Sequence, residues 1–152
     1  MLFYLAPMEG ITGYIVRNAY AHYFPYIDKY FTPFIPAAKK MSKKIKRDLA
    51  AENNDQIRLV PQLIGNRADE FLMMIRQLEE LGFTSVNLNF GCPSGTVVSK
   101  RKGAGFLSNY FVEMHNRDDR KAQVTEFLSF LKDENLLPPK GGCTLDIGCG
   151  VC

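Results

Sequence analysis

The residues of this chain best suited to chemistry surround a cysteine that follows a short apolar run. Within that run Asn87 and Asn89 alternate with apolar residues, so both amides fall on one face of a predicted strand. Gly91 and Pro93 then end the strand and hold Cys92 in a tight turn. A buried amide costs about 1–3 kcal/mol unless it is hydrogen-bonded. The pattern therefore predicts a polar site with a thiol at its edge, and capping amides beside an inert thiol are the alternative.

The composition is that of an ordinary globular protein. The 152 residues are 46% hydrophobic and 23% charged, with a formal net charge of +3, which suits one domain with a real core. The sequence contains no run of about 18 apolar residues, so it predicts no membrane span. Pro7 comes too early for a secretory signal peptide. The cysteines, at positions 92, 143, 149 and 152, do not form a disulfide framework. We expect a reduced, cytoplasmic protein with no membrane partner.

Strand and helix patterns alternate along the first 90 residues. The predicted strands cover residues 2–7, 27–35, 57–64 and 85–90. The predicted helices cover residues 14–23, 42–51 and 69–81. The last helix has an apolar stripe made of Phe71, Met74, Ile75 and Leu78. Gly82 is its expected C-cap, whereas Pro61 lies inside the third strand, where proline removes a hydrogen-bond donor.

This alternation predicts an α/β fold with a parallel sheet, either a (β/α)8 barrel or a doubly wound sheet. The unusual residues, among them Glu9, Gln62 and Cys92, fall at strand ends, where barrel enzymes build their sites. A doubly wound sheet often has a glycine-rich first turn, but residues 8–13 lack G-x-G-x-x-G. We therefore expect the N-terminal half of a TIM (β/α)8 barrel, with about four βα units.

Three motifs follow one another in order: APMEGIT at Ala6–Thr12, PQLIG at Pro61–Gly65 and NLNFGCP at Asn87–Pro93. A basic loop, Ser99–Leu107, comes after them. Together they resemble the tRNA-dihydrouridine synthase family over about residues 1–107. The resemblance implies a flavin-dependent TIM-barrel oxidoreductase with an added helical tRNA-binding domain. Such an enzyme uses FMN and NADPH to reduce uridine to 5,6-dihydrouridine in tRNA.

By this resemblance Cys92 is the general acid of the reaction. Reducing the C5–C6 bond of uracil needs a hydride at one carbon and a proton at the other. A thiol is mostly protonated at neutral pH and can therefore give that proton. The alternative for Cys92 is a buried, inert thiol.

The resemblance also assigns residues to the cofactor and the substrate. Gln62 would hydrogen-bond the flavin, since an amide within an apolar strand needs partners; a purely structural amide is the alternative. The backbone of Pro7 and Met8 would meet the flavin ring, and Glu9 belongs to the same segment or points to solvent. Asn89 resembles a position near the substrate uridine.

Two groups of cations are candidates for contact with RNA. Six lysine and arginine residues lie between positions 39 and 47, and Lys100, Arg101 and Lys102 follow the cysteine loop. Lysine and arginine bind phosphate independently of sequence, whereas a solvated helix face is the alternative. With the family resemblance, tRNA is the expected partner.

The resemblance ends near residue 107, so we expect an unrelated second unit at 108–152. A helix is predicted at 121–131 and a linker at 136–142. Residues 144–150, TLDIGCG, resemble the first motif of class I S-adenosylmethionine methyltransferases. Cys149 and Cys152 have the spacing of a redox or zinc pair, or are incidental residues of a glycine turn.

These expectations leave several functions open. The chain is an FMN-dependent oxidoreductase acting on tRNA, or a non-catalytic remnant that at most binds RNA, with a methyltransferase fragment as a minor alternative. A half-barrel would have open sheet edges, which favour self-association.

Overall fold

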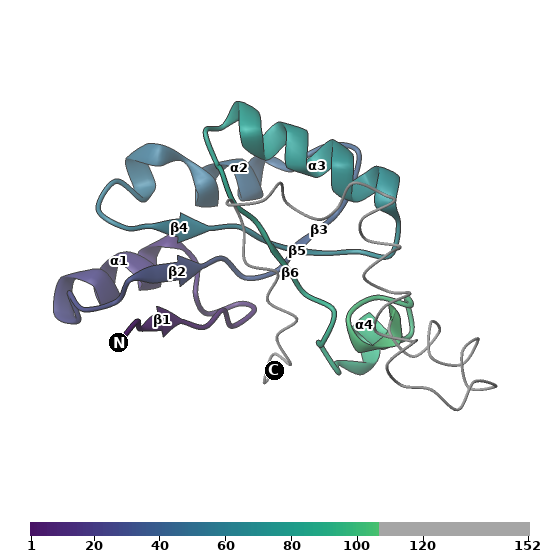
Figure 1. Cartoon of the computed structure of the whole chain (residues 1–152), viewed down its shortest axis with the longest axis horizontal. Helices are drawn as coiled ribbons and strands as arrows, with labels where there is room; N and C mark the ends of the chain where they lie inside the picture. Colours follow the sequence, from purple (N-terminus) through teal and green to yellow (C-terminus); the bar gives the residue numbers. More distant parts are fainter. Residues whose placement is uncertain (107–152) are drawn as a thin grey trace.

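The computed structural model describes residues 1–106, an α/β arrangement of short strands and helices (Figure 1). The strands are β1 (Tyr4–Leu5), β2 (Lys29–Phe31), β3 (Ile35–Pro36), β4 (Leu59–Val60), β5 (Gln62–Ile64) and β6 (Asn87–Leu88). The helices are α1 (Tyr14–Tyr23), α2 (Lys43–Leu49), the 3-10 helix η1 (Ala51–Asn53), α3 (Ala68–Glu80) and α4 (Gly95–Val98). The elements predicted for 108–152, including the methyltransferase-like turn, lie outside the described residues.

All described strands are parallel and follow one another in chain order. One sheet has the order β1-β2-β4 and the other has the order β3-β5-β6. The first predicted strand therefore neighbours the second, the second the third, and the third the fourth. A doubly wound sheet reverses its order at a switch point, and no such reversal occurs among the strands of residues 1–106. The order is that of a (β/α) barrel.

The second and third predicted strands are each broken in the middle, so their prediction as continuous strands is wrong. Pro61 separates β4 from β5 because it has no N–H to give to the neighbouring strand. Next to it, the Gln62 N–H donates to the Thr32 hydroxyl at 2.9 Å, while Thr32 N–H donates to Val60 O at 3.2 Å. A buried side chain thus replaces a backbone acceptor where the sheet divides. The outer predicted strands are also shorter in the structure than expected.

The helices agree closely with the predictions. α1 has the predicted bounds, α2 begins after Ser42, whose hydroxyl accepts from Ile45 N–H at 3.3 Å, and α3 is shifted by one residue. Leu81 is the C-cap of α3, one residue before the predicted Gly82, and Gly82 follows it with φ +88°, the left-handed conformation typical of a glycine just past a helix end. No helix of the described part is long and apolar enough to cross a membrane.

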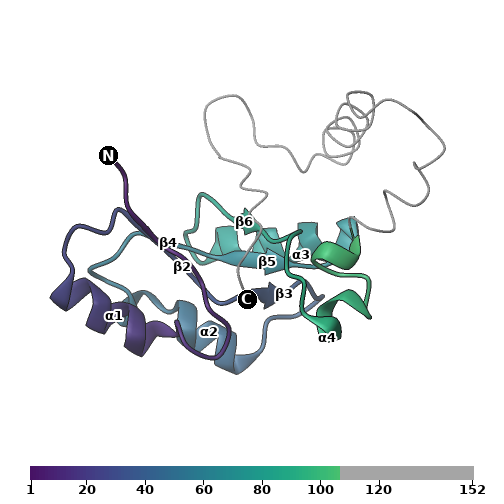
Figure 2. The same cartoon turned by 90° about the horizontal axis from the view of Figure 1, so that it is seen from below.

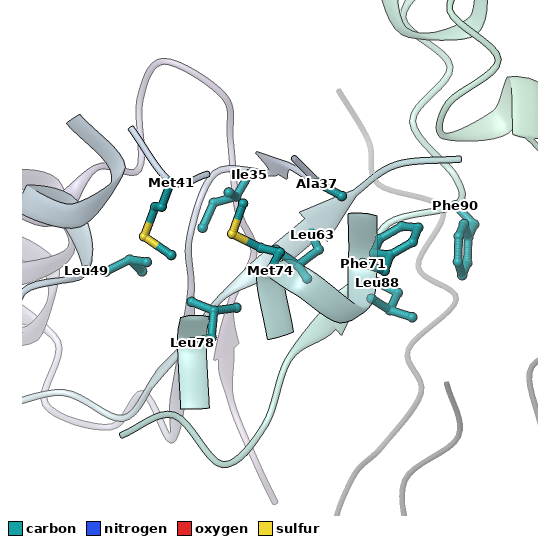
Figure 3. Packing of buried hydrophobic residues seen from close by; sticks show 10 residues of the cluster. All are labelled: Ile35, Ala37, Met41, Leu49, Leu63, Phe71, Met74, Leu78, Leu88 and Phe90. Carbon is teal, nitrogen blue, oxygen red and sulfur yellow. The ribbon is translucent and has the colours of Figure 1, made fainter. Parts of the chain in front are cut away.

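The apolar core lies between the sheet and the helices on one side of it. α2 and α3 run along that side (Figure 1), and the view from below has the sheet in front of α3 (Figure 2). Figure 3 shows the cluster packed there, whose members are Ile35, Ala37, Met41, Leu49, Leu63, Phe71, Met74, Leu78, Leu88 and Phe90. The predicted stripe of α3 supplies three of them, and Ile75 packs at the margin. Alternation along the strands then leaves Gln62, Asn87 and Asn89 on the opposite face of the sheet.

Two adjacent methionines on α3 test this core. Met74 is 0% exposed and Met73 is 40% exposed. Met74→Ala should lower the free energy of unfolding by about 2–5 kcal/mol, because it leaves a cavity among packed side chains. Met73→Ala should change it little. Urea denaturation of both variants measures the difference, and equal losses would mean that α3 does not pack through this face.

Candidate active site

Three side-chain amides form a row across β5 and β6. Gln62 and Asn87 are partners in the strand register, and Gln62 Nε2 donates to Asn87 Oδ1 at 2.6 Å. Asn89 Nδ2 donates to Gln62 Oε1 at 3.0 Å. The three residues are only 5–9% exposed. The amides therefore satisfy one another on the face opposite the apolar core, and the structure brings together the predicted site residues Gln62 and Asn89.

Asn89 also holds the cysteine loop. Its Oδ1 accepts from Gly91 N–H at 3.1 Å and from Cys92 N–H at 3.0 Å. On the other side, Cys92 O accepts from Ala104 N–H at 3.0 Å. Both backbone groups of Cys92 are thus fixed, and the residue is 1% exposed. A ligand can reach this thiol only after a local change that uncovers it.

The basic loop folds back onto Cys92. Gly103 has φ +54°, and a Cβ there would stand 2.7 Å from Cys92 O and 3.0 Å from Cys92 Cβ, so only glycine fits without movement. Lys100 and Arg101 precede it and are exposed, and Lys100 O accepts from Asn66 Nδ2 at 3.2 Å. The predicted RNA-contacting cations therefore stand on a loop whose base is packed against the candidate acid.

The segment after β1 closes on itself around Thr12. The Thr12 hydroxyl accepts from Met8 N–H at 2.8 Å and donates to Met8 O at 3.1 Å. Pro7 is half-buried, and Met8 and Glu9 are exposed. Because the strands are parallel, Pro7–Glu9 after β1 and Cys92 after β6 lie toward the same carboxyl end of the sheet.

A buried arginine, which the sequence analysis missed, anchors this segment. Arg17 is 0% exposed and donates to Thr12 O at 2.8 Å, to Asp48 Oδ2 at 3.1 Å, to Asp48 O at 2.9 Å and to Asn54 Oδ1 at 2.9 Å. Burial lowers the pKa of Arg17, and the charge and hydrogen bond of Asp48 oppose that shift. Asp48 Oδ1 also accepts from Tyr14 N–H at 2.8 Å and so caps α1 from α2. The arginine thereby joins the loop after β1 to two helices.

The signal for this network was weak in the sequence. An arginine on an amphipathic helix usually lies on its solvated face, and its acceptors on Asp48 and Asn54 are 31 and 37 residues away along the chain. Thr32, which accepts from Gln62 N–H, gave no signal either. Within the described part of the chain no cluster of three or more His, Cys, Asp or Glu side chains could hold a metal ion.

Removing the Arg17 side chain tests how much it contributes to the stability of the fold. Arg17→Ala leaves several buried acceptors without their donor and should cost about 3 kcal/mol of unfolding free energy. The matched control is Arg67→Ala, because Arg67 pairs with Asp69 at 2.8 Å on the surface, with the two side chains 61% and 47% exposed, where ion pairs contribute little. Chemical denaturation compares them, and a control as damaging as Arg17→Ala would contradict the assignment.

Comparison with known proteins gives the same family as the motifs. The family described as "Dihydrouridine synthase (Dus)" matches residues 4–112. A "Probable tRNA-dihydrouridine synthase" of Staphylococcus epidermidis is 29% identical over 108 residues, covering 69% of this chain and 33% of that protein. One of Staphylococcus aureus and a "Probable tRNA-dihydrouridine synthase 2" of Bacillus subtilis match with the same identity and coverage. The chain spans about a third of the length of these relatives.

Proposed function

Because the chain belongs to the dihydrouridine synthase family, we propose that it takes part in the reduction of uridine to 5,6-dihydrouridine in tRNA. FMN is its proposed cofactor, NADPH its reductant and the cytoplasm its location. The observation that carries the proposal is the contact of Asn89 with both Gln62 and the Cys92 backbone. That contact joins the proposed flavin-binding amide to the proposed proton donor.

The amide row has the chemistry that a flavin edge requires. A flavin ring presents carbonyl and ring-nitrogen acceptors beside an N–H donor. In the bonds described, Gln62 Nε2 and Asn89 Nδ2 each use one of their two hydrogens. The remaining hydrogens suit such acceptors. The segment Pro7–Glu9 follows β1, at the carboxyl end of the sheet. When bound and reduced, FMN supplies the hydride.

The role of Cys92 is to complete the reduction with a proton. Its S–H bond breaks as a C–H bond forms at whichever carbon of the C5–C6 bond has not received the hydride, which leaves a thiolate to be reprotonated. Asn89 and Ala104 hold the cysteine backbone, so the thiol keeps a fixed direction. The uridine must leave its place in the folded tRNA to reach it, at a cost of a few kcal/mol.

Exposed cations at the carboxyl end of the sheet suit a polyanionic substrate. Lys39 and Lys40 follow β3. Lys100 and Arg101 follow α4, and Lys100 O accepts from Asn66, just after β5. Both pairs therefore lie toward the carboxyl ends of the strands. We propose that they contact tRNA phosphates.

A half-barrel formed by these βα units, with self-association through the outer edges of β1 and β6, belongs to the same proposal and predicts dimers in size-exclusion chromatography.

Flavin binding and product formation test the proposal together. Cys92→Ala should lower dihydrouridine formation by about 100-fold or more, the usual contribution of a positioned acid, while FMN affinity stays unchanged. Cys143→Ala, outside the described residues, is the control and should keep activity. Flavin absorbance reports binding, and mass spectrometry of unmodified tRNA incubated with NADPH reports product. A chain without flavin at saturating FMN contradicts the proposal. FMN and tRNA binding without product would favour the non-catalytic RNA-binding alternative.

The salt dependence of tRNA binding tests the surface. Lys100→Gln and Arg101→Gln should each weaken binding and reduce the slope of log K against log salt by about one, if each cation contacts one phosphate. Arg58→Gln is the matched control, since Arg58 is exposed just before β4, at the amino end of the sheet. Fluorescence anisotropy at several salt concentrations measures the slopes, and equal effects of all three variants would rule out this loop as the contact.

A further inference from the structure

We propose that Asn89 is a positioning residue that fixes Cys92 relative to Gln62, so that the Gln62 amide and the Cys92 backbone respond as one unit. The sequence resemblance had suggested a place for Asn89 near the substrate. The inference rests on the proposed function only in assigning Gln62 to the flavin and Cys92 to the proton. The contacts that carry it belong to the chain itself.

Both ends of the Asn89 amide are in use. Its oxygen accepts from two consecutive backbone N–H groups, at Gly91 and Cys92, and its nitrogen donates to Gln62 Oε1. Asn89 is 5% exposed, so water cannot readily replace any of these bonds. A change in the position of the Gln62 amide therefore reaches the Cys92 turn through one side chain.

The hydrogen bonds all run in one direction. Cys92 N–H donates to Asn89, Asn89 donates to Gln62, and Gln62 donates to Asn87. Amides linked in this order polarise one another, and each bond strengthens its neighbours by about 10–30%. Replacement of Gln62 should therefore loosen the Cys92 N–H through Asn89.

The side chain at position 89 needs both an acceptor and a donor at this length. Aspartate keeps the acceptor for Gly91 and Cys92 but has no donor for Gln62 when it is ionised. Alanine loses both groups. Comparing the two variants therefore separates the effect of the hydrogen bonds to the Gly91 and Cys92 N–H groups from the effect of the hydrogen bond to Gln62.

Amide hydrogen exchange of Gly91 and Cys92, followed by NMR in the flavin-free chain, tests the inference. Asn89→Ala should speed exchange of both amides about tenfold, the effect of losing one hydrogen bond. Asn89→Asp should restore most of that protection. Gln62→Ala should speed exchange of both backbone amides by about two- to fivefold, through Asn89. In the Asn89→Asp background, Gln62→Ala should cause no further increase in exchange.

Two variants with equivalent chemistry elsewhere are the controls. Gln77→Ala removes an amide that accepts from Met41 N–H at 3.0 Å, and Asn18→Ala removes one that donates to Asn53 O at 2.9 Å. Neither should alter exchange at Gly91 or Cys92. The alkylation rate of Cys92 by iodoacetamide, measured by peptide mapping, is a second readout and should rise severalfold in Gln62→Ala.

The outcomes distinguish this inference from the proposed function. If Gln62→Ala behaves like Gln77→Ala, or if Asn89→Asp fails to restore protection, the coupling is contradicted even where FMN binds. If the chain binds no FMN but these exchange rates change as expected, the proposed function fails and the positioning role of Asn89 stands. If Asn89→Ala does not fold, Asn89→Asp and Gln62→Ala still decide the question.

Discussion

The constraint on which this structure depends is that a buried amide needs partners for both of its ends. Gln62, Asn87 and Asn89 are buried on one face of a parallel sheet, and each satisfies another. An unpartnered amide there would cost about 1–3 kcal/mol. The row is therefore stable only when β5 and β6 keep their register and the cysteine turn keeps its shape. A polar requirement thus fixes the geometry of the candidate site.

The two faces of the sheet divide stability and chemistry between them. Leu63, Leu88 and Phe90 pack toward α3 and build the core, whereas the amides alternate with them on the other face. The sheet itself divides at Pro61, where Thr32 takes the N–H of Gln62. Gln62, the middle amide of the row, is therefore held by its backbone as well as by its side chain. Packing on one face supports a polar site on the other.

Much of this arrangement could be predicted from the sequence. Periodicity gave α1 and α3 almost to the residue, because the apolar stripe and Gly82 are local signals. The shared face of Asn87 and Asn89 followed from alternation alone. Pro61 was a local sign of trouble in the third strand, but the role of Thr32 and the Arg17 network could not be predicted, because they depend on partners about 30 or more residues away. Side-chain hydrogen bonds between distant segments have no periodic pattern to reveal them.

The close return of Gly103 over Cys92 has a mechanical consequence. With so little room between them, and with Ala104 N–H bonded to Cys92 O, the cysteine and the base of the basic loop cannot shift independently. Any force that displaces Lys100 or Arg101 would therefore also displace the turn that carries the sulfur. Movement of the basic loop and exposure of the buried thiol would then occur together.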